Sequence, residues 1–307
     1  MKILVTGGAG FIGSHIVNAY IDAGHDVIVI DDLSSGQMEL LNPKATLYKM
    51  SILSPEVKAI LEKEKITIIN HHAAQISVSR SVADPTFDAN SNIIGTLQLL
   101  QIAVSLNIEK FIFASTGGAM YGEQKTFPAS EEHPCQPLSP YALSKFCAEK
   151  YIHYFATQYG LNTTVLRYSN VYGPHQNPHG EAGVVAIFCE RLLKGQQPII
   201  NGDGEQTRDF IYVQDIVQAN TIALNPQCSG MFNVGTGKET SVNFLTQCIL
   251  KASTKPISIE HGPAKEGEQR RSAIDSRKIS ERFGWKPGVS LEEGLLETFN
   301  YFQNKTT

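Results

Sequence analysis

The glycine-rich segment TGGAGFIG, residues 6–13, restricts the fold of this 307-residue chain more than any other part of it. It follows the apolar run KILVT directly and opens FIGSHIVNAYIDAG, where apolar residues recur at helical spacing. A strand that turns through glycines into a helix starts a βαβ unit. Short β-rich runs and longer amphipathic segments go on alternating to about residue 174. This alternation predicts a parallel sheet with helices on both faces.

We place strands at residues 2–7, 26–31, 46–50, 66–74 and 110–116, a sixth strand with its exit loop at 162–174, and helices at 11–24, 55–64, 90–107 and 139–160. After Pro174, loops rich in glycine and proline separate helices near 181–194, 213–225, 241–252 and 290–303 and a strand near 209–212. We therefore predict an α/β fold. Residues 1–170, with segments near 209–236 returning to them, form a Rossmann-type doubly wound parallel sheet, and residues 171–307 form mainly a smaller α+β lobe. Ligands bind at the carboxyl ends of such strands, so we expect the site between the two parts.

The glycines of the first segment predict a dinucleotide site. Gly7, Gly10 and Gly13 allow a tight turn and close approach of a pyrophosphate, to which the next helix offers free N–H groups. Asp31 ends the second strand, where a confirming acid is expected, and Asp32 stands beside it. A carboxylate accepts hydrogen bonds from ribose hydroxyls and repels a 2′-phosphate, and no lysine or arginine follows in DDLSSGQ. The pattern predicts NAD rather than NADP.

A tyrosine and a lysine share one face of a predicted helix. Tyr141 and Lys145 are four residues apart in SPYALSK, where Ser139 and Pro140 suit the start of a helix. A nearby ammonium and a cationic nicotinamide would lower the pKa of the phenol, which is near 10 in water. Tyr141 is therefore a candidate general base. About 25 residues earlier, the strand end ASTGGAMYG carries adjacent hydroxyls at Ser115 and Thr116.

Several segments together resemble the extended short-chain dehydrogenases/reductases, in the NAD-dependent epimerase/dehydratase branch and most closely its UDP-glucose 4-epimerases. The resemblance covers essentially the whole chain. The segments are TGGAGFIG, HHAAQISV, ASTGGAMYG, SPYALSK, LRYSNVYGP, GDGEQTRDFIYVQDI, NVGTG and AIDSRKISERFGWKP.

This resemblance implies a catalytic triad of Thr116, Tyr141 and Lys145. Ser115 stays open as the alternative hydroxyl, because the stretch has one residue more than the commonest epimerase pattern. It also implies a set of residues around NAD, in which Tyr168 packs against the nicotinamide and Asn92 bonds backbone. The set is Gly7, Gly10, Phe11, Ile12, Gly13, Asp31, Asp32, Ser34, Gly36, Ser51, Ile52, Ala73, Ala74, Gln75, Asn92, Tyr141, Lys145 and Tyr168.

For a UDP-sugar, the resemblance implies that Asn170 bonds a phosphate oxygen and that Arg208 holds the diphosphate. Val184 and Val185 begin the helix beside the uridine. The second diphosphate cation is open among Lys265, Arg270 and Arg271, because PAKEGEQRR departs from the family pattern. The residue that limits room beside C2 of the sugar falls at Ser272, a small side chain that would admit N-acetylated sugars.

The implied reaction is an isomerisation: reversible oxidation of a UDP-hexose at C4 through a 4-keto sugar. Related 4,6-dehydratases carry STDEVYG and UDP-glucuronate decarboxylases STSEVYG, whereas this chain has Gly117, Gly118 and Ala119 in place of the acids. We therefore expect 4-epimerisation of UDP-glucose and UDP-galactose, with N-acetylated sugars as further candidates. Another nucleotide-sugar activity of the branch, UDP-glucuronate 4-epimerisation included, is the alternative. A non-catalytic NAD-binding module is a remote one.

The composition of the chain excludes some classes of binding partner. The net charge of −4 offers no basic field for nucleic acid or anionic membranes. The five scattered cysteines and the lack of a leader-like segment suggest a cytoplasmic protein. We expect no metal, since prolines interrupt the pair His175 and His179. By resemblance, helices near 90–106 and 140–159 would pair two copies into a homodimer.

Overall fold

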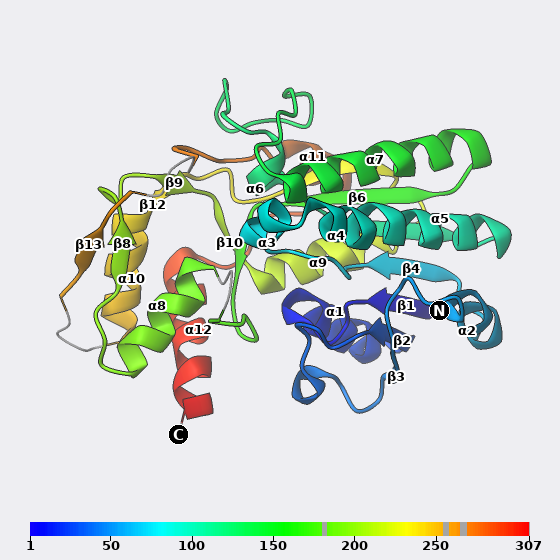
Figure 1. Ribbon diagram of the computed structural model, residues 1–307, viewed down its shortest axis with the longest axis horizontal. Helices are drawn as coiled ribbons and strands as arrows, with labels where there is room; N and C mark the ends of the chain where they lie inside the picture. Colours follow the sequence, from blue (N-terminus) through cyan, green and yellow to red (C-terminus); the bar gives the residue numbers. More distant parts are fainter. Residues whose placement is uncertain (180–182, 254–257, 265–268, 307) are drawn as a thin grey trace.

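A seven-stranded parallel sheet forms the centre of the molecule, in the order β11-β6-β5-β4-β1-β2-β3 (Figure 1). The computed structural model describes residues 1–179, 183–253, 258–264 and 269–306. The strands are β1 (Lys2–Thr6), β2 (Asp26–Asp31), β3 (Thr46–Lys49), β4 (Ile68–His71), β5 (Lys110–Thr116), β6 (Thr163–Tyr168) and β11 (Gly230–Val234). The order runs outward from β1 in both directions, as in a doubly wound sheet, so the predicted fold class is confirmed.

Helices cover both faces because the strands are apolar on both sides. On one face, α2 (Val57–Glu64), α5 (Gly95–Ser105) and α7 (Pro140–Tyr159) contribute to a core that includes Leu61, Leu99 and Ile152. On the other, α1 (Phe11–Asp22), α9 (Val213–Ala223) and α11 (Arg277–Phe283) contribute to a second core. Thus α9 and β11 return to the large sheet, in the region where the sequence placed a returning segment.

The smaller lobe surrounds a third core, which α8 (Val184–Leu193), α10 (Val242–Ser253) and α12 (Leu291–Thr306) share (Figure 1). In the part of the chain that the structure describes, three pairs of short strands border it: β7 (Asn170–Tyr172) with β10 (Phe210–Tyr212), β8 (Ile199–Asn201) with β13 (Glu260–Gly262), and β9 (Thr207–Arg208) with β12 (Thr240–Ser241). The domain boundaries themselves stay a prediction.

The predicted helix at 90–107 differs from the structure. Residues Asn90–Ile94 form a π-helical turn, η2, and α5 begins only at Gly95. The short helices α3 (Val78–Ala83) and α4 (Pro85–Ala89) precede η2, and α6 (Gly117–Met120) follows β5 directly. π-helical turns are frequent at functional sites, and this one carries Asn92.

A histidine pair joins the first helix of the sheet domain to the loop after β7. The imidazoles of His15 and His175 stack with centroids 4.3 Å apart. Nδ1 of His175 is 2.8 Å from Ser14 Oγ, and Nε2 of His15 is 2.9 Å from the carbonyl oxygen of Pro174. The ring of Tyr301, on α12, lies 5.3 Å from that of His175. Three segments far apart in sequence therefore meet at this junction.

Candidate active site

The glycine loop between β1 and α1 has the geometry of a pyrophosphate cradle. Gly7 has a φ of +70°, and a Cβ there would lie 2.7 Å from the backbone nitrogen of Ala73. A Cβ on Gly13 would collide with the carbonyl group of Gly7. The N-cap of α1 is Gly10, whose position offers no side-chain cap to the first N–H groups. The loop thus fits a dinucleotide phosphate, for which helix N–H groups and bare backbone are the usual partners.

Asp31 closes this loop from the end of β2. Its Oδ2 accepts from the N–H of Ala9 at 3.0 Å and its Oδ1 from the N–H of Leu33 at 2.9 Å. Burial raises the pKa of this carboxyl, and the two N–H groups act against that rise. Asp32 Oδ1 accepts from the N–H of Ser34. The carboxylate expected at a ribose is therefore present, next to the glycine loop and fixed by backbone.

Several other residues of the predicted cofactor set lie in α1 or follow β2 and β3. A Cβ on Gly36 would lie 2.9 Å from Oδ1 of Asp31, so the loop after β2 passes close to the carboxylate. Ser51 Oγ accepts from the N–H of Leu53, which leaves the hydroxyl hydrogen available, and Ile52 is buried in the core. Phe11 and Ile12 form the first turn of α1 and pack partly against the core of the smaller lobe.

Asn92 holds the loop after β4. Its Oδ1 accepts from the N–H of Gln75 at 3.0 Å, and its Nδ2 donates to the carbonyl oxygen of Gln75 at 2.9 Å. Nδ2 also lies 3.0 Å from Oδ1 of Asp88. The N–H of Ala73 donates to the hydroxyl of Thr6. These bonds fix residues 73–75, the neighbours of Ala74 in the predicted cofactor wall, at the carboxyl end of the sheet.

Tyr141 and Lys145 lie in the first turns of α7. Ser139 caps this helix by accepting from the N–H of Ala142, and Pro140 is its first residue, as predicted. Nζ of Lys145 donates to the carbonyl oxygen of Ala114 at 3.0 Å and lies 4.7 Å from the ring centroid of Phe113. The helix therefore places the lysine against the end of β5.

Burial shifts both pKa values of this pair. It lowers the pKa of Lys145 to about 8, although Asp88 and Glu149 act in the other direction. Burial, with the charge of Asp88, raises the pKa of Tyr141 to about 12. The predicted lowering of the phenol pKa depends on the positive charge of a bound nicotinamide as well as on the lysine, and it stays a prediction.

The two adjacent hydroxyls of ASTGGAMYG differ in burial. Ser115 is buried, and its Oγ donates to Oε1 of Glu149 at 2.6 Å. Thr116 ends β5, is partly exposed and forms the N-cap of α6 without capping it through its side chain. Ser115 is thus engaged within the protein, and Thr116 is the better candidate for the substrate hydroxyl.

The sequence did not lead us to predict the buried ion pair between Arg167 and Glu149. Arg167 on β6 donates to both carboxylate oxygens of Glu149, from Nε at 2.9 Å and from Nη2 at 2.6 Å. Arg167 Nη1 also donates to the hydroxyl of Tyr121, which donates to Oδ1 of Asn233. Glu149 follows Lys145 by one turn of α7. The spacing of Tyr141, Lys145 and Glu149, four residues each, is the signal that could have suggested it.

Tyr168 ends β6 beside the predicted nicotinamide region. Its ring stacks on that of His72 with centroids 6.0 Å apart, and its hydroxyl accepts from Nδ2 of Asn220 at 2.8 Å. Burial raises the pKa of Tyr168, so its phenol remains protonated. Tyr168 is therefore held as a neutral packing residue and not as a second base.

A cavity of about 350 Å³ opens between β7, α8 and β10. Four of the residues predicted for the UDP-sugar, Asn170, Val184, Val185 and Arg208, line it. Buried Oδ1 of Asn170 has no hydrogen-bond partner among the described residues. Nη1 of Arg208 donates to the carbonyl oxygen of Thr207. Apolar walls with an amide and a guanidinium at one side suit a base and its diphosphate.

The remaining substrate predictions lie outside the lining of this cavity. Arg270 forms a bidentate ion pair with Asp203, and Arg271 one with Glu239, both at the surface. Ser272 is buried. Lys265 falls outside the described residues. Arg270 and Arg271 would have to leave their carboxylate partners to reach a phosphate.

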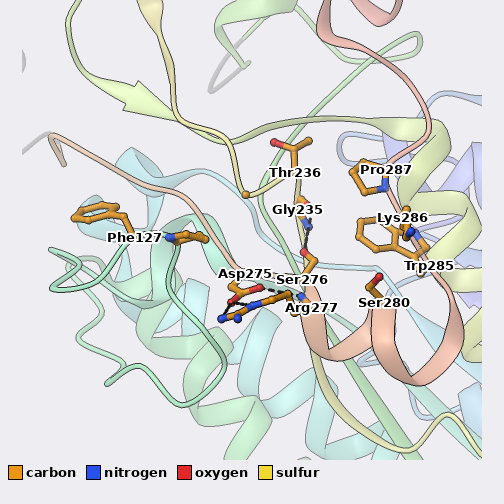
Figure 2. Close-up of a pocket in the computed structure, with 12 residues that line it drawn as sticks. Phe127, Gly235, Thr236, Asp275, Ser276, Arg277, Ser280, Trp285, Lys286 and Pro287 are labelled. Atoms are coloured by element: carbon orange, nitrogen blue, oxygen red, sulfur yellow. Dashed lines mark hydrogen bonds and ion pairs between the residues drawn. The ribbon is translucent and has the colours of Figure 1, made fainter.

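A second cavity, of about 530 Å³, lies around α11 (Figure 2). Trp285 and Pro287 line one side of it and Phe127 the other, with the ion pair of Asp275 and Arg277 between them. None of the residues predicted for cofactor or substrate lines this cavity. The candidate active site is therefore the one predicted from the sequence, Thr116, Tyr141 and Lys145 with the cavity beside Arg208, and the roles of its residues stay predictions.

Among the residues that the structure describes, no three His, Cys, Asp or Glu side chains come together as a metal site. Within the same residues, no helix has the length and apolar character needed to cross a bilayer.

Known proteins that are similar to this chain identify its family. Residues 3–235 match the NAD dependent epimerase/dehydratase family. The chain is 44% identical to UDP-glucose 4-epimerase of Mycolicibacterium smegmatis, over 100% of both chains. UDP-glucose 4-epimerase from Thermotoga maritima, determined with UDP-glucose, has a TM-score of 0.97 and 48% identity, over 100% of both chains. The Thermus thermophilus enzyme, determined in complex with NAD, has a TM-score of 0.94 and 40% identity, over 99% of both chains. This chain belongs to the NAD-dependent epimerase/dehydratase family.

Proposed function

We propose that this chain is an NAD-dependent isomerase that inverts C4 of UDP-glucose and UDP-galactose through a transient 4-keto sugar. The observation that carries the proposal is the arrangement at the end of β5. Thr116 stands beside the helix of Tyr141 and Lys145, and the next residues, Gly117 and Gly118, carry no acid or base. The full-length similarity to UDP-glucose 4-epimerases supports the same reaction.

Each residue of the proposed site has its own role in the reaction. Tyr141 takes the proton of the C4 hydroxyl and later returns it, and Thr116 shares the hydrogen bond to that oxygen. Lys145, fixed on the Ala114 carbonyl, holds the ribose side of the cofactor. NAD, when bound, supplies the acceptor and donor of hydride and a positive charge that favours the phenolate. With no carboxylate at positions 117–119, the 4-keto sugar rotates in the site and is then reduced on its other face.

The cavity beside Arg208 is the reason why we propose a nucleotide sugar as the substrate. Val184 and Val185 begin α8 beside the base, Asn170 offers its unpartnered amide oxygen and its N–H donors, and Arg208 brings positive charge for the diphosphate. This anchoring at one end leaves the sugar free to rotate at the other. We further propose that Ser272, being small, admits UDP-N-acetylglucosamine.

The test is incubation of the purified protein with UDP-glucose, UDP-N-acetylglucosamine and UDP-glucuronate separately, followed by NMR of the anomeric and C4 protons. Conversion of UDP-glucose to UDP-galactose is the expected result. Failure to convert the acetylated sugar would contradict only the Ser272 proposal. Loss of water or of CO₂ from a substrate would contradict epimerisation. It would indicate dehydration or decarboxylation, which are alternative activities of the branch.

We propose a homodimer that forms through α7 and its neighbours. Three apolar residues of α7 at helical spacing, Ala148, Ile152 and Phe155, pack inside the monomer. Large apolar side chains are instead exposed on the outer side of α4, η2 and α7: Phe87, Ile94, Leu143, Tyr151 and Tyr154. Such a surface is typical of a subunit interface. Light scattering of wild type and of Leu143→Glu tests it, since a dimer should dissociate in the variant.

We also propose a cytoplasmic location. All five cysteines are free thiols in the structure, as expected of a protein kept in a reducing compartment.

A further inference from the structure

Asp88 is a buried carboxylate that uses only one of its two oxygens for hydrogen bonds. It lies on the short helix α4 and has no exposed surface. Its Oδ1 accepts from Nε2 of Gln75 at 2.9 Å and from Nδ2 of Asn92 at 3.0 Å. Its Oδ2 has no hydrogen-bond partner among the described residues. Buried carboxylates normally have donors or a cation at both oxygens, so this arrangement requires a reason.

The hydrogen bonds of Oδ1 connect Asp88 to the predicted wall of the cofactor site. The side-chain amide of Asn92 bonds both the N–H and the carbonyl oxygen of Gln75. Oε1 of Gln75 in turn accepts from the N–H of Ser77, the N-cap of α3. These bonds hold the loop after β4 in place through Oδ1. They leave the negative charge and the second oxygen of Asp88 without a structural purpose.

Lys145 is the opposite case, a buried cation without a carboxylate partner. Its Nζ donates to the carbonyl oxygen of Ala114 and lies over the ring of Phe113. Among the described residues, neither Lys145 nor Asp88 takes part in an ion pair. The helix of Lys145, α7, packs against α4 (Figure 1). Two unpaired charges of opposite sign are thus buried in neighbouring helices, where low polarity strengthens their attraction.

The ionisation of Tyr141 and Lys145 agrees with this attraction. Burial lowers the pKa of Lys145, and Asp88 is the strongest of the groups that raise it again. Asp88 also contributes to the rise of the Tyr141 pKa. The carboxylate therefore favours the protonated form of both side chains.

Other charged groups around the lysine are paired or neutral. Glu149 also raises the pKa of Lys145, but Glu149 is already paired with Arg167. On β4, burial and the charge of Lys145 lower the pKa values of His71 and His72, so both imidazoles are neutral. Asp88 is therefore the unpaired carboxylate that balances the lysine.

We infer that Asp88 is a positioning residue of the epimerase reaction, an inference that rests on the proposed function. Its carboxylate joins the cofactor wall of Gln75 and Asn92 to the helix of Tyr141 and Lys145, and its charge balances the buried ammonium. Lys145 thereby stays cationic and able to hold the ribose of NAD. Tyr141 keeps its proton until the positive charge of the nicotinamide is beside it.

The test is the pH profile of Asp88→Asn. An amide has the shape of a carboxylate and keeps an oxygen for Gln75 and Asn92, so this variant removes the charge and little else. Without that charge, the pKa values of Tyr141 and Lys145 should both fall. The acid limb of kcat, where Tyr141 becomes protonated, and the alkaline limb, where Lys145 loses its proton, should both move down by about one pH unit. At a pH above the alkaline limb, kcat should then be about tenfold below that of wild type.

Binding of NAD gives a second readout that does not require turnover. We assign Lys145 to the ribose, so the Kd for NAD, from calorimetric titration at about pH 6 to pH 10, should rise where the lysine loses its proton. In Asp88→Asn this rise should begin about one pH unit lower. If wild type does not epimerise UDP-glucose, the proposed function fails, and the two Kd profiles still decide the role of Asp88.

Asp84 supplies the matched control on the same helix. It is exposed and is the N-cap of α4, where it accepts from the N–H of Phe87 at 2.9 Å. Arg80, the cation of α3 at this side of α4, is also exposed and lies over the ring of Phe87. Asparagine caps a helix as well as aspartate does, and water screens this charge, so Asp84→Asn should keep both limbs at their wild-type pH.

Two further variants at position 88 separate charge from folding. Asp88→Glu keeps the charge, so both limbs should stay in place even where the longer side chain lowers kcat. Asp88→Ser is neutral and small, and it should show the same displacement if the asparagine variant does not fold.

Limbs that stay in place in the neutral variants, with kcat lowered equally at every pH, would overturn the inference, because Asp88 would then only hold the loop. An equal displacement in Asp84→Asn would also overturn it, since any lost surface charge would then have the same effect.

Discussion

Replacement of Glu149 by glutamine tests how strongly the buried ion pair supports the catalytic helix. The side chains of Arg167 and Glu149 are 3% and 2% exposed, and the shorter of their two bonds is 2.6 Å. A glutamine keeps the shape but places an NH₂ group against one guanidinium donor, and it leaves the arginine charge unbalanced. Loss of one charge from a buried pair costs about 3–5 kcal/mol. At roughly 2–4 °C per kcal/mol for a large domain, the melting temperature should fall by about 10 °C.

An exposed ion pair of the same geometry gives the control. Arg270 and Asp203 form two hydrogen bonds of 2.7 and 2.8 Å, but their side chains are 55% and 58% exposed. Asp203→Asn should leave the melting temperature close to that of wild type, because water screens the pair and solvates the freed arginine. Both variants are measured by differential scanning calorimetry without cofactor. Equal melting temperatures for Glu149→Gln and Asp203→Asn would refute the assignment of a supporting role to the buried pair.

Three other substitutions probe base, pH and cofactor separately. Tyr141→Phe should lower kcat by at least about 10³-fold while NAD binding, followed by calorimetric titration, persists, since the phenol is the only proton acceptor we assign; near-normal turnover would remove Tyr141 from this role. Burial first, and then the charges of His15 and Lys305, lower the pKa of His175 from 6.5 to about 4. Between these pH values the unfolded chain takes up a proton that the folded chain refuses, so the free energy of unfolding decreases as the pH falls from 6.5 towards 4. In His175→Asn this slope in melting temperature should flatten, and an unchanged slope would contradict the assignment. Gly13→Ala should raise the Kd for NAD by at least about tenfold, because its methyl group would collide with loop backbone; an unchanged Kd would show that the loop is not the cradle.

The sequence was sufficient for features that depend on neighbours along the chain. The glycine loop, the acid after β2 and the capped helix of Tyr141 and Lys145 are local patterns, and the structure has each of them at the predicted place. The doubly wound sheet followed from the alternation of strands and helices, because each βα unit is a local signal.

Features that depend on contacts between distant segments could not be predicted in this way. Glu149 meets Arg167 and Ser115 only after three elements of the fold are assembled, and the choice of Thr116 over Ser115 depends on that meeting. Ala273 and Asp275 are held by backbone hydrogen bonds to Ala129, which lies more than a hundred residues earlier in the chain. The rise of the Tyr141 pKa comes from burial and from the charge of Asp88, neither of which the sequence shows.

The most direct test of the account follows the hydrogen at C4. UDP-glucose that carries deuterium at C4 is incubated with the protein in ordinary water, and the UDP-galactose formed is examined by NMR and mass spectrometry. Oxidation and reduction at the same carbon within one closed site predict that the product keeps its deuterium at C4. Replacement of that deuterium by solvent hydrogen would contradict the account, because C4 would then be inverted by proton exchange.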